Sequence, residues 1–213
     1  MSHADDERPA VAAIVHDGTS DVDALLGAFA ERQRAGGRKV YGLVMQHRAA
    51  SEGCRAAMFL SDVDSGREYL VSQPLGAEST ACRADPQGFA QASAVLRDAL
   101  ERRPDLVVCN RFGALEAEGG GFAAELLALL ERGIPVLTVV GPRHAAAWQR
   151  FVGEAAALPN DPAAWDAWLD AVMSLESVLK KTVTCSWLLW THSSCCLMLQ
   201  IPLNHIESGN PNG

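Results

Sequence analysis

The chain has 213 residues, of which 48% are apolar, and a formal net charge of −8 at pH 7. This length and composition predict one globular domain with a sizeable core, alone or with an appendage. The acidic balance, without a cluster of Lys or Arg, argues against nucleic acid as a partner, because such a surface needs a concentrated basic patch. Residues 1–9 are acidic and lack the apolar stretch of a signal peptide. We therefore expect a disordered N-terminus there and a cytoplasmic protein.

Composition changes sharply near Met173. Residues 174–213 contain no Ala, Arg or Asp, yet they carry half of the six cysteines. We interpret 174–213 as an atypical tail that is foreign to the fold and not native to it. Within the tail, 182–206 is uncharged and about long enough to span a bilayer. His192 and Pro202 are among the residues that interrupt this stretch, so a membrane anchor is the less favoured alternative.

The first part of the chain predicts a βαβ unit. The apolar run 10–15 is typical of a buried strand, and apolar residues at helical spacing follow it from Val22 to Phe29. Ser20 or Asp21 can cap this helix, and the Gly36–Gly37 pair ends it. A second strand is expected over 39–45. Strands joined in this way by a helix predict a parallel sheet.

The next elements predict a β-hairpin inserted into that sheet. Two β-prone runs, 56–62 and 67–73, flank the turn composition of residues 63–66. A loop leads to a helix that starts near Pro86, and the apolar residues 106–109 form a central strand. Further elements are a helix over 122–133, a strand over 134–140, and helices over 145–152 and 161–172. The result is a three-layer α/β domain over residues 10–173 with a mainly parallel sheet.

The central strand runs into a polar, glycine-bearing loop. Ligands of open parallel sheets bind at the carboxyl ends of the strands. We therefore predict a ligand site here, with Arg111 binding an oxyanion and Glu116 acting as the catalytic residue that orients water or a metal. The alternative is a structural loop in which Arg111 pairs with Glu116 or Glu118. The predicted ligand-binding residues of this loop are Asn110, Arg111, Gly113 and Glu118.

Two further sets of residues are candidates. The loop after the first strand supplies a second wall of the site, with Asp17, Gly18, Thr19 and Ser20 as ligand-binding residues. Ordinary helix capping is the alternative for Ser20. Cys54 and Cys82, with His47 and Cys109, could bind a soft metal or a molybdenum species. Their spacing is a weak signature, so free or buried thiols are the favoured alternative, and a nucleophilic cysteine is a third.

The chain resembles an uncharacterised bacterial family, a domain of unknown function often found near molybdenum-related genes. The resemblance covers about residues 10–170 and is carried chiefly by the segment NRFGALEAEGGGF, the strand IPVLTVV and the loop CRADP. More distantly, the order of elements is similar to that of small P-loop nucleoside-triphosphatases. The resemblance implies a P-loop-like fold, with a nucleotide, Mg²⁺ or molybdate as candidate ligands or cofactors.

The departures from a working triphosphatase bear on function. A phosphate loop needs G-x-x-x-x-G-K-[ST], whereas residues 16–21 hold one glycine, no lysine and two carboxylates. Asn110 and Arg111 stand where that family carries acids at the strand end. The sequence therefore predicts a nucleotide- or oxyanion-binding protein with a degenerate phosphate loop, and fast triphosphate hydrolysis is not expected. The alternatives are a slow metal-dependent phosphohydrolase that uses Glu116, and a regulatory scaffold without a small ligand.

Overall fold

The computed structural model describes residues 10–16, 21–48, 57–73 and 83–175. The chain divides into two compact units, Met1–Met173 and Ser174–Gly213, and their boundary lies where the composition changes. The predicted disordered N-terminus 1–9 lies outside the described residues, and so does the uncharged stretch 182–206. Among the helices that the structure does describe, none is long and apolar enough to cross a membrane.

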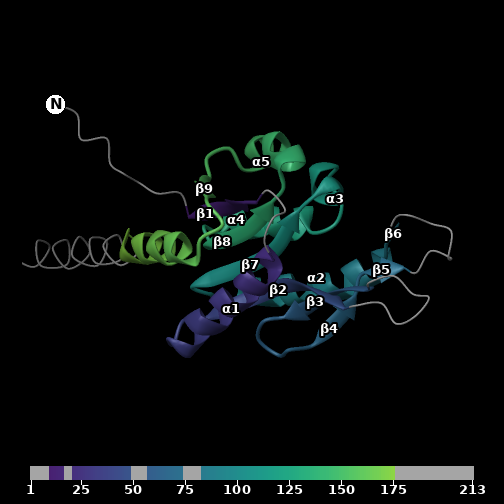
Figure 1. The fold of residues 1–213 in the computed structure, drawn as a ribbon, viewed down its shortest axis with the longest axis horizontal. Coiled ribbons are helices and arrows are strands. Elements are labelled where there is room, and N and C mark those ends of the chain that lie inside the picture. The colour runs from purple at the N-terminus through teal and green to yellow at the C-terminus, as the bar shows by residue number, and fades with distance from the viewer. Residues whose placement is uncertain (1–9, 17–20, 49–56, 74–82, 176–213) are drawn as a thin grey trace, which may run out of the picture. The chain divides into compact units, whose positions relative to one another are not determined.

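The first unit is built around a seven-stranded sheet with the order β4-β3-β2-β7-β8-β1-β9 (Figure 1). Strands β2, β7, β8, β1 and β9 run parallel, and β3 and β4 extend the sheet as an antiparallel hairpin. The strands are β1 (Val11–Val15), β2 (Val40–Arg48), β3 (Ala57–Asp62), β4 (Glu68–Leu70), β7 (Leu106–Phe112), β8 (Val136–Val140) and β9 (Ala156–Leu158), with a separate pair β5 (Ser72–Gln73) and β6 (Arg83–Ala84). The helices are α1 (Val22–Ala35), α2 (Pro86–Arg102), α3 (Ala114–Ala117), α4 (Ala123–Glu131), η1 (Pro142–His144) and α5 (Ala145–Val152), and the chain is helical again from 162 to 173.

The two longest labelled helices, α1 and α2, begin where the sequence supplies a side-chain cap. The carboxylate of Asp21 accepts a hydrogen bond from the backbone N–H of Ala24 at 3.1 Å and so starts α1. Asp85 caps α2 in the same way through the N–H of Gln87, and Pro86 occupies the first helical position, where its missing N–H costs nothing. These caps fix the points at which the chain leaves the carboxyl edge of the sheet.

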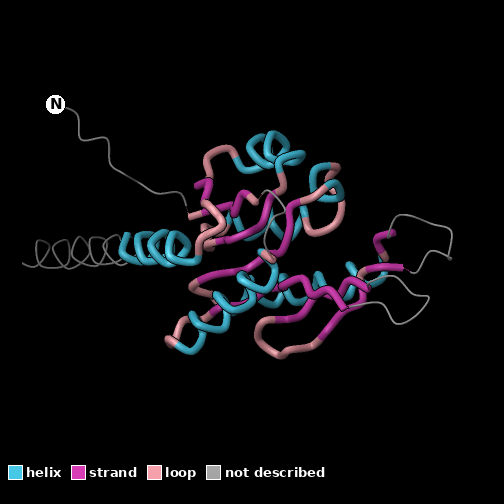
Figure 2. Tube along the Cα trace, viewed as in Figure 1, coloured by secondary structure: helices cyan, strands magenta, loops and turns pink. Residues whose placement is uncertain are grey.

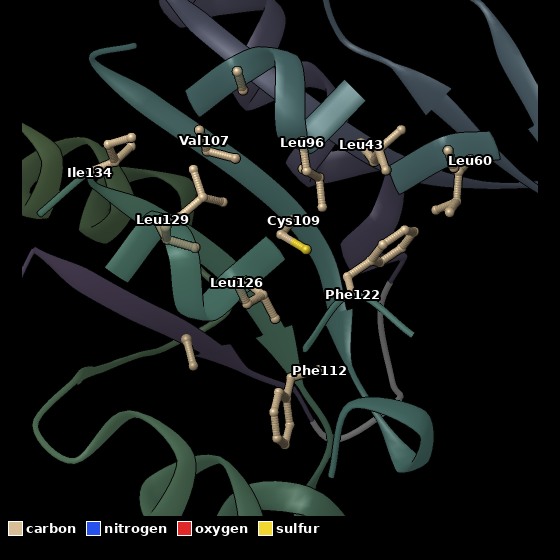
Figure 3. Close-up of a cluster of buried hydrophobic side chains, with 14 of the residues drawn as sticks. Leu43, Leu60, Leu96, Val107, Cys109, Phe112, Phe122, Leu126, Leu129 and Ile134 are labelled. Atoms are coloured by element: carbon tan, nitrogen blue, oxygen red, sulfur yellow. The ribbon is translucent and has the colours of Figure 1, made fainter. Parts of the chain in front are cut away.

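The strands of the sheet are the magenta segments of Figure 2, and the cyan helices flank them. Apolar residues of the parallel strands alternate between two cores, one on each face of the sheet. In β7, Leu106 and Val108 pack against α1 and the helix 162–173, where Trp165 and Trp168 are fully buried. The opposite face packs against α2, α4 and α5. Figure 3 shows Cys109 of β7 within that second core, among the side chains of α2 and α4.

The β3–β4 hairpin connects the two helical layers at its turn. Asp64, in that turn, accepts a hydrogen bond from Arg34 near the end of α1 at 2.8 Å. Its second oxygen accepts a hydrogen bond from Arg102 at the end of α2 at 2.7 Å. Arg34 also donates to the carbonyl oxygen of Val63. A single aspartate therefore contacts the ends of two helices that lie on opposite faces of the sheet.

The predicted α/β fold class, with a mainly parallel sheet between two helical layers and an inserted hairpin, is confirmed. One strand, β8, lies between the first strand β1 and the central strand β7. The short helix α3 and the edge strand β9 were not predicted, since four and three residues give no readable periodicity.

Candidate functional site

The candidate site begins with an irregularity at the end of β7. Cys109 pairs with Thr138 of β8, but the next pair along the two strands is Phe112 with Val140. Two residues of β7, Asn110 and Arg111, therefore stand opposite one residue of β8, which is a β-bulge. Arg111 has a φ of +62°, in the left-handed region that side-chain-bearing residues rarely adopt. Such irregularities at a strand end re-aim side chains, and they concentrate at functional sites.

The bulge brings two adjacent side chains to one acceptor. In a regular strand, Asn110 and Arg111 would point to opposite faces of the sheet. Here both donate to Asp23, in the first turn of α1, from Asn110 Nδ2 at 3.2 Å and from Arg111 Nη2 at 2.9 Å. The Nε2 atom of His47, at the end of β2, lies 3.1 Å from the same Asp23 Oδ2 that Arg111 contacts. We call these four residues, Asp23, His47, Asn110 and Arg111, the Asp23 cluster.

The members of the Asp23 cluster differ in exposure. The side chain of Asp23 is only 5% exposed, whereas those of Arg111 and His47 are 39% and 50% exposed. A buried carboxylate is tolerated because donors surround it. The guanidinium of Arg111 has five N–H groups, and Asp23 is its one hydrogen-bond partner among the described residues. Within the described ranges its remaining donors have no partner, and guanidinium donors of this kind suit an oxyanion chemically.

Asn110 contributes the opposite kind of group. It is 2% exposed, and the hydrogen bond from its Nδ2 atom to Asp23 fixes which way the amide points. Its Oδ1 atom is buried and has no hydrogen-bond partner among the residues that the structure describes. An unpaired buried acceptor is uncommon, because leaving it without a hydrogen bond costs free energy. The Asp23 cluster therefore combines two half-exposed cationic or donor groups with one unused acceptor.

Glu116 has different surroundings. It is 4% exposed, and its two oxygens accept hydrogen bonds from the backbone N–H groups of Gly113 at 3.0 Å and Phe122 at 3.2 Å. These two bonds close the loop between β7 and α4. The catalytic role predicted for Glu116 stays a prediction, and the described contacts give its carboxylate a role in holding this loop.

The other predicted residues are placed as follows. Gly113 is the N-cap of α3, and Glu118 is exposed at its C-cap. Arg111 pairs with Asp23 and with neither Glu116 nor Glu118. The predicted second wall, Asp17, Gly18, Thr19 and Ser20, lies outside the described residues, and so do the proposed metal ligands Cys54 and Cys82.

Burial raises the pKa of the Cys109 thiol, with smaller contributions from Glu116 and Glu125. In the described ranges, no group of three or more His, Cys, Asp or Glu side chains is placed to hold a metal ion.

Asp23 was missed by sequence reasoning, although a signal existed. It shares one face of α1 with Leu26, Ala30 and Gln33, and all four residues are buried. A carboxylate at helical spacing on an apolar face must find donors when the helix packs. His47 was noted only as a weak metal ligand, because its partner comes from another element 24 residues away.

The fold and this strand-end cluster define an α/β protein compatible with a P-loop-nucleoside-triphosphatase-like fold. The chain belongs to the family described as "Protein of unknown function (DUF2478)", whose family model matches residues 11–168. The resemblance to a domain of unknown function is thereby confirmed.

Among curated proteins, the chain is 38% identical over 143 residues to the "Molybdenum import ATP-binding protein ModC 2" of Bradyrhizobium diazoefficiens. The match covers 67% of this chain but only 16% of that protein. No solved structure matches the chain.

Proposed function

We propose that this protein binds a small oxyanion, either free or as the phosphate group of a nucleotide, at the Asp23 cluster. The observation that carries the proposal is the ion pair between Arg111 and Asp23. The buried carboxylate holds the guanidinium in one place, while the side chain stays 39% exposed. A donor whose orientation is fixed before binding loses less conformational entropy when an anion arrives.

His47 supports the same proposal. Its ring nitrogen contacts the Asp23 oxygen that also accepts from Arg111, so one carboxylate orients both half-exposed groups. Asp23 offsets the positive charge of Arg111, so the attraction for an anion comes mainly from hydrogen-bond donors. The cluster therefore favours a small anion that Arg111 and His47 can contact together.

The residues at the end of β7 support binding of an anion and not its fast hydrolysis. Triphosphatases of the P-loop class use a loop lysine, a Mg²⁺ held by an acid, and a residue that positions water. This chain has Asn110 and Arg111 at the strand end, and its loop 16–21 has no lysine. The similar protein from Bradyrhizobium is named for molybdenum import and ATP binding. On that likeness, molybdate and nucleotides join phosphate as the first anions to test.

The test is a titration of the full chain with phosphate, sulfate, molybdate, tungstate, and ADP or ATP with Mg²⁺, at constant ionic strength. Calorimetry and thermal melting give the dissociation constants and the stabilisation. We expect Arg111→Met to weaken the tightest anion about tenfold or more, because hydrogen bonds to charged groups contribute about 1.5–3 kcal/mol. Arg150→Met removes the same charge from an exposed site in α5 and should leave affinity within about twofold.

The outcomes separate the candidate functions. Equal weakening by the two substitutions would mean that net charge, and not the Asp23 cluster, drives binding. If no anion stabilises the chain, the scaffold alternative replaces this proposal. If ATP is hydrolysed and Glu116→Gln abolishes the turnover, the phosphohydrolase alternative replaces it.

A further inference from the structure

A concave site lies on the other face of the sheet from the Asp23 cluster. A cavity of about 610 Å³ opens between the first turns of α2 and the chain from α3 to α4. The residues that matter for its chemistry are Phe89 and Ser93 of α2, Leu115 of α3, Gly121, and Glu125 of α4. None of the residues that line this cavity belongs to the Asp23 cluster. Its volume falls within the range of about 300–1,000 Å³ that is typical of small-molecule sites.

The walls of the cavity suit a flat ring. The ring of Phe89 packs against that of Phe122 with centroids 5.2 Å apart, so its position is fixed by the core. Leu115, at the cavity, is 37% exposed and adds apolar surface to the wall. Gly121 also lines the cavity, and the packing of the loop explains its lack of a side chain, because a Cβ atom there would stand 2.1 Å from Glu116 Oε1. Its backbone is therefore part of the cavity wall.

One carboxylate supplies the polar contact. The side chain of Glu125 is 11% exposed, and its Oε1 atom accepts a hydrogen bond from Arg97 at 2.8 Å. Among the described residues, no hydrogen bond reaches its Oε2 atom. Ser93 is already engaged, because its hydroxyl donates to the carbonyl of Ala90 and accepts from Arg97. The unused polar capacity of the cavity is therefore an acceptor, which selects a ligand with N–H donors.

The ion pair between Arg97 and Glu125 limits which charge the ligand needs to carry. Arg97 already neutralises Glu125, so the cavity does not require a cation, and neutral N–H donors suffice. Oε1 of Glu125 keeps a second lone pair beside its bond to Arg97, so the carboxylate can accept from two adjacent, parallel donors through Oε1 and Oε2. We propose that this cavity binds a flat heteroaromatic base with a ring N–H beside an exocyclic amino group, the donor edge that guanine carries. In this proposal Phe89 stacks on the ring of the base, and the carboxylate of Glu125 accepts hydrogen bonds from its ring N–H and amino group.

The test uses guanosine as the probe and inosine, which lacks the exocyclic amino group, as its matched control. Saturation-transfer NMR and calorimetry on the full chain report binding. We expect guanosine to bind about tenfold or more tightly than inosine, because the missing donor contacts a charged group. Ala90→Phe places a ring from the exposed face of α2 into the cavity without touching the core, and it should abolish guanosine binding. Glu125→Gln should remove the preference for guanosine over inosine.

The result that overturns the proposal is guanosine binding that is absent, equal to that of inosine, or unchanged in Ala90→Phe. Circular dichroism and melting of each variant show whether it is folded. If Glu125→Gln fails to fold, the Ala90→Phe comparison still decides. The inference is independent of oxyanion binding, because Arg111→Met should leave guanosine binding unchanged and Ala90→Phe should leave anion binding unchanged.

Discussion

Two carboxylates, Asp23 and Glu116, are buried to the same extent, each 4% exposed, yet their partners differ. Asp23 accepts from side chains of three residues on two strands, and two of these side chains reach solvent. Glu116 accepts from two backbone N–H groups, three and six residues away in the same loop. The comparison shows that equally buried acids can be satisfied by two different kinds of donor. An acid that orients exposed side chains can serve a ligand, whereas one that satisfies backbone donors holds a loop.

The largest expected effect tests the loop-holding role. Glu116→Ala leaves two buried backbone N–H groups without acceptors, so the free energy of unfolding should fall by about 2–4 kcal/mol. Glu118→Ala removes an exposed carboxylate two residues away and should change it by no more than about 0.5 kcal/mol. Urea unfolding measures both. A loss below about 1 kcal/mol in Glu116→Ala would show that this carboxylate is not structural.

The second prediction concerns how tightly the Glu116 loop is packed. Gly121 has a φ of +54°, and an added Cβ would collide with Glu116 Oε1. Gly119, with a φ of +82°, has no atom within 4 Å of such a Cβ. Gly121→Ala should therefore cost about 2–3 kcal/mol of stability, and Gly119→Ala about 1 kcal/mol from backbone strain alone. Equal thermal melting of the two variants would contradict the described contact.

The third prediction is that Asp23 contributes less to stability than Glu116 does. Asp23→Ala removes the acceptor, but the half-exposed side chains of Arg111 and His47 can regain water. The free energy of unfolding should fall by about 1–2 kcal/mol, mostly from Asn110, which stays buried. Anion affinity should fall as well, since Arg111 loses its fixed orientation. A stability loss as large as that of Glu116→Ala would remove the distinction between the two carboxylates.

The smallest effect on stability is expected for Arg111→Gly. Glycine relieves the left-handed backbone at this position, a gain of about 1 kcal/mol, and this offsets the lost ion pair with Asp23. Unfolding by urea should therefore stay within about 1 kcal/mol of the parent protein, while anion affinity falls about tenfold or more. A variant that loses stability but keeps its anion affinity would reverse the proposed role of this arginine.

Much of the fold could be predicted from local sequence. The continuous apolar run predicted the strand Val136–Val140 to within two residues, because a strand buried on both faces is apolar throughout. The helix Ala145–Val152 was predicted from apolar residues at helical spacing. The Asp23 cluster could not be predicted in full. The pair of Asp23 and Arg111 joins residues 88 positions apart, and it depends on a bulge that no composition signals. The position of β8 beside β1 is likewise a property of the whole sheet.

The contact between Asp64 and the two arginines has a practical consequence for engineering. Exposed hairpin tips are usual sites for inserting tags or circularly permuting a chain, because little depends on their geometry. Each ion pair here is half-exposed and contributes little energy by itself. Together the two ion pairs set the distance between the carboxyl ends of α1 and α2, because both helices bind the same aspartate. An affinity tag or fluorophore placed between Asp62 and Gly66 would therefore loosen two helices at once, and the turn at Gly133 is a better choice for labelling.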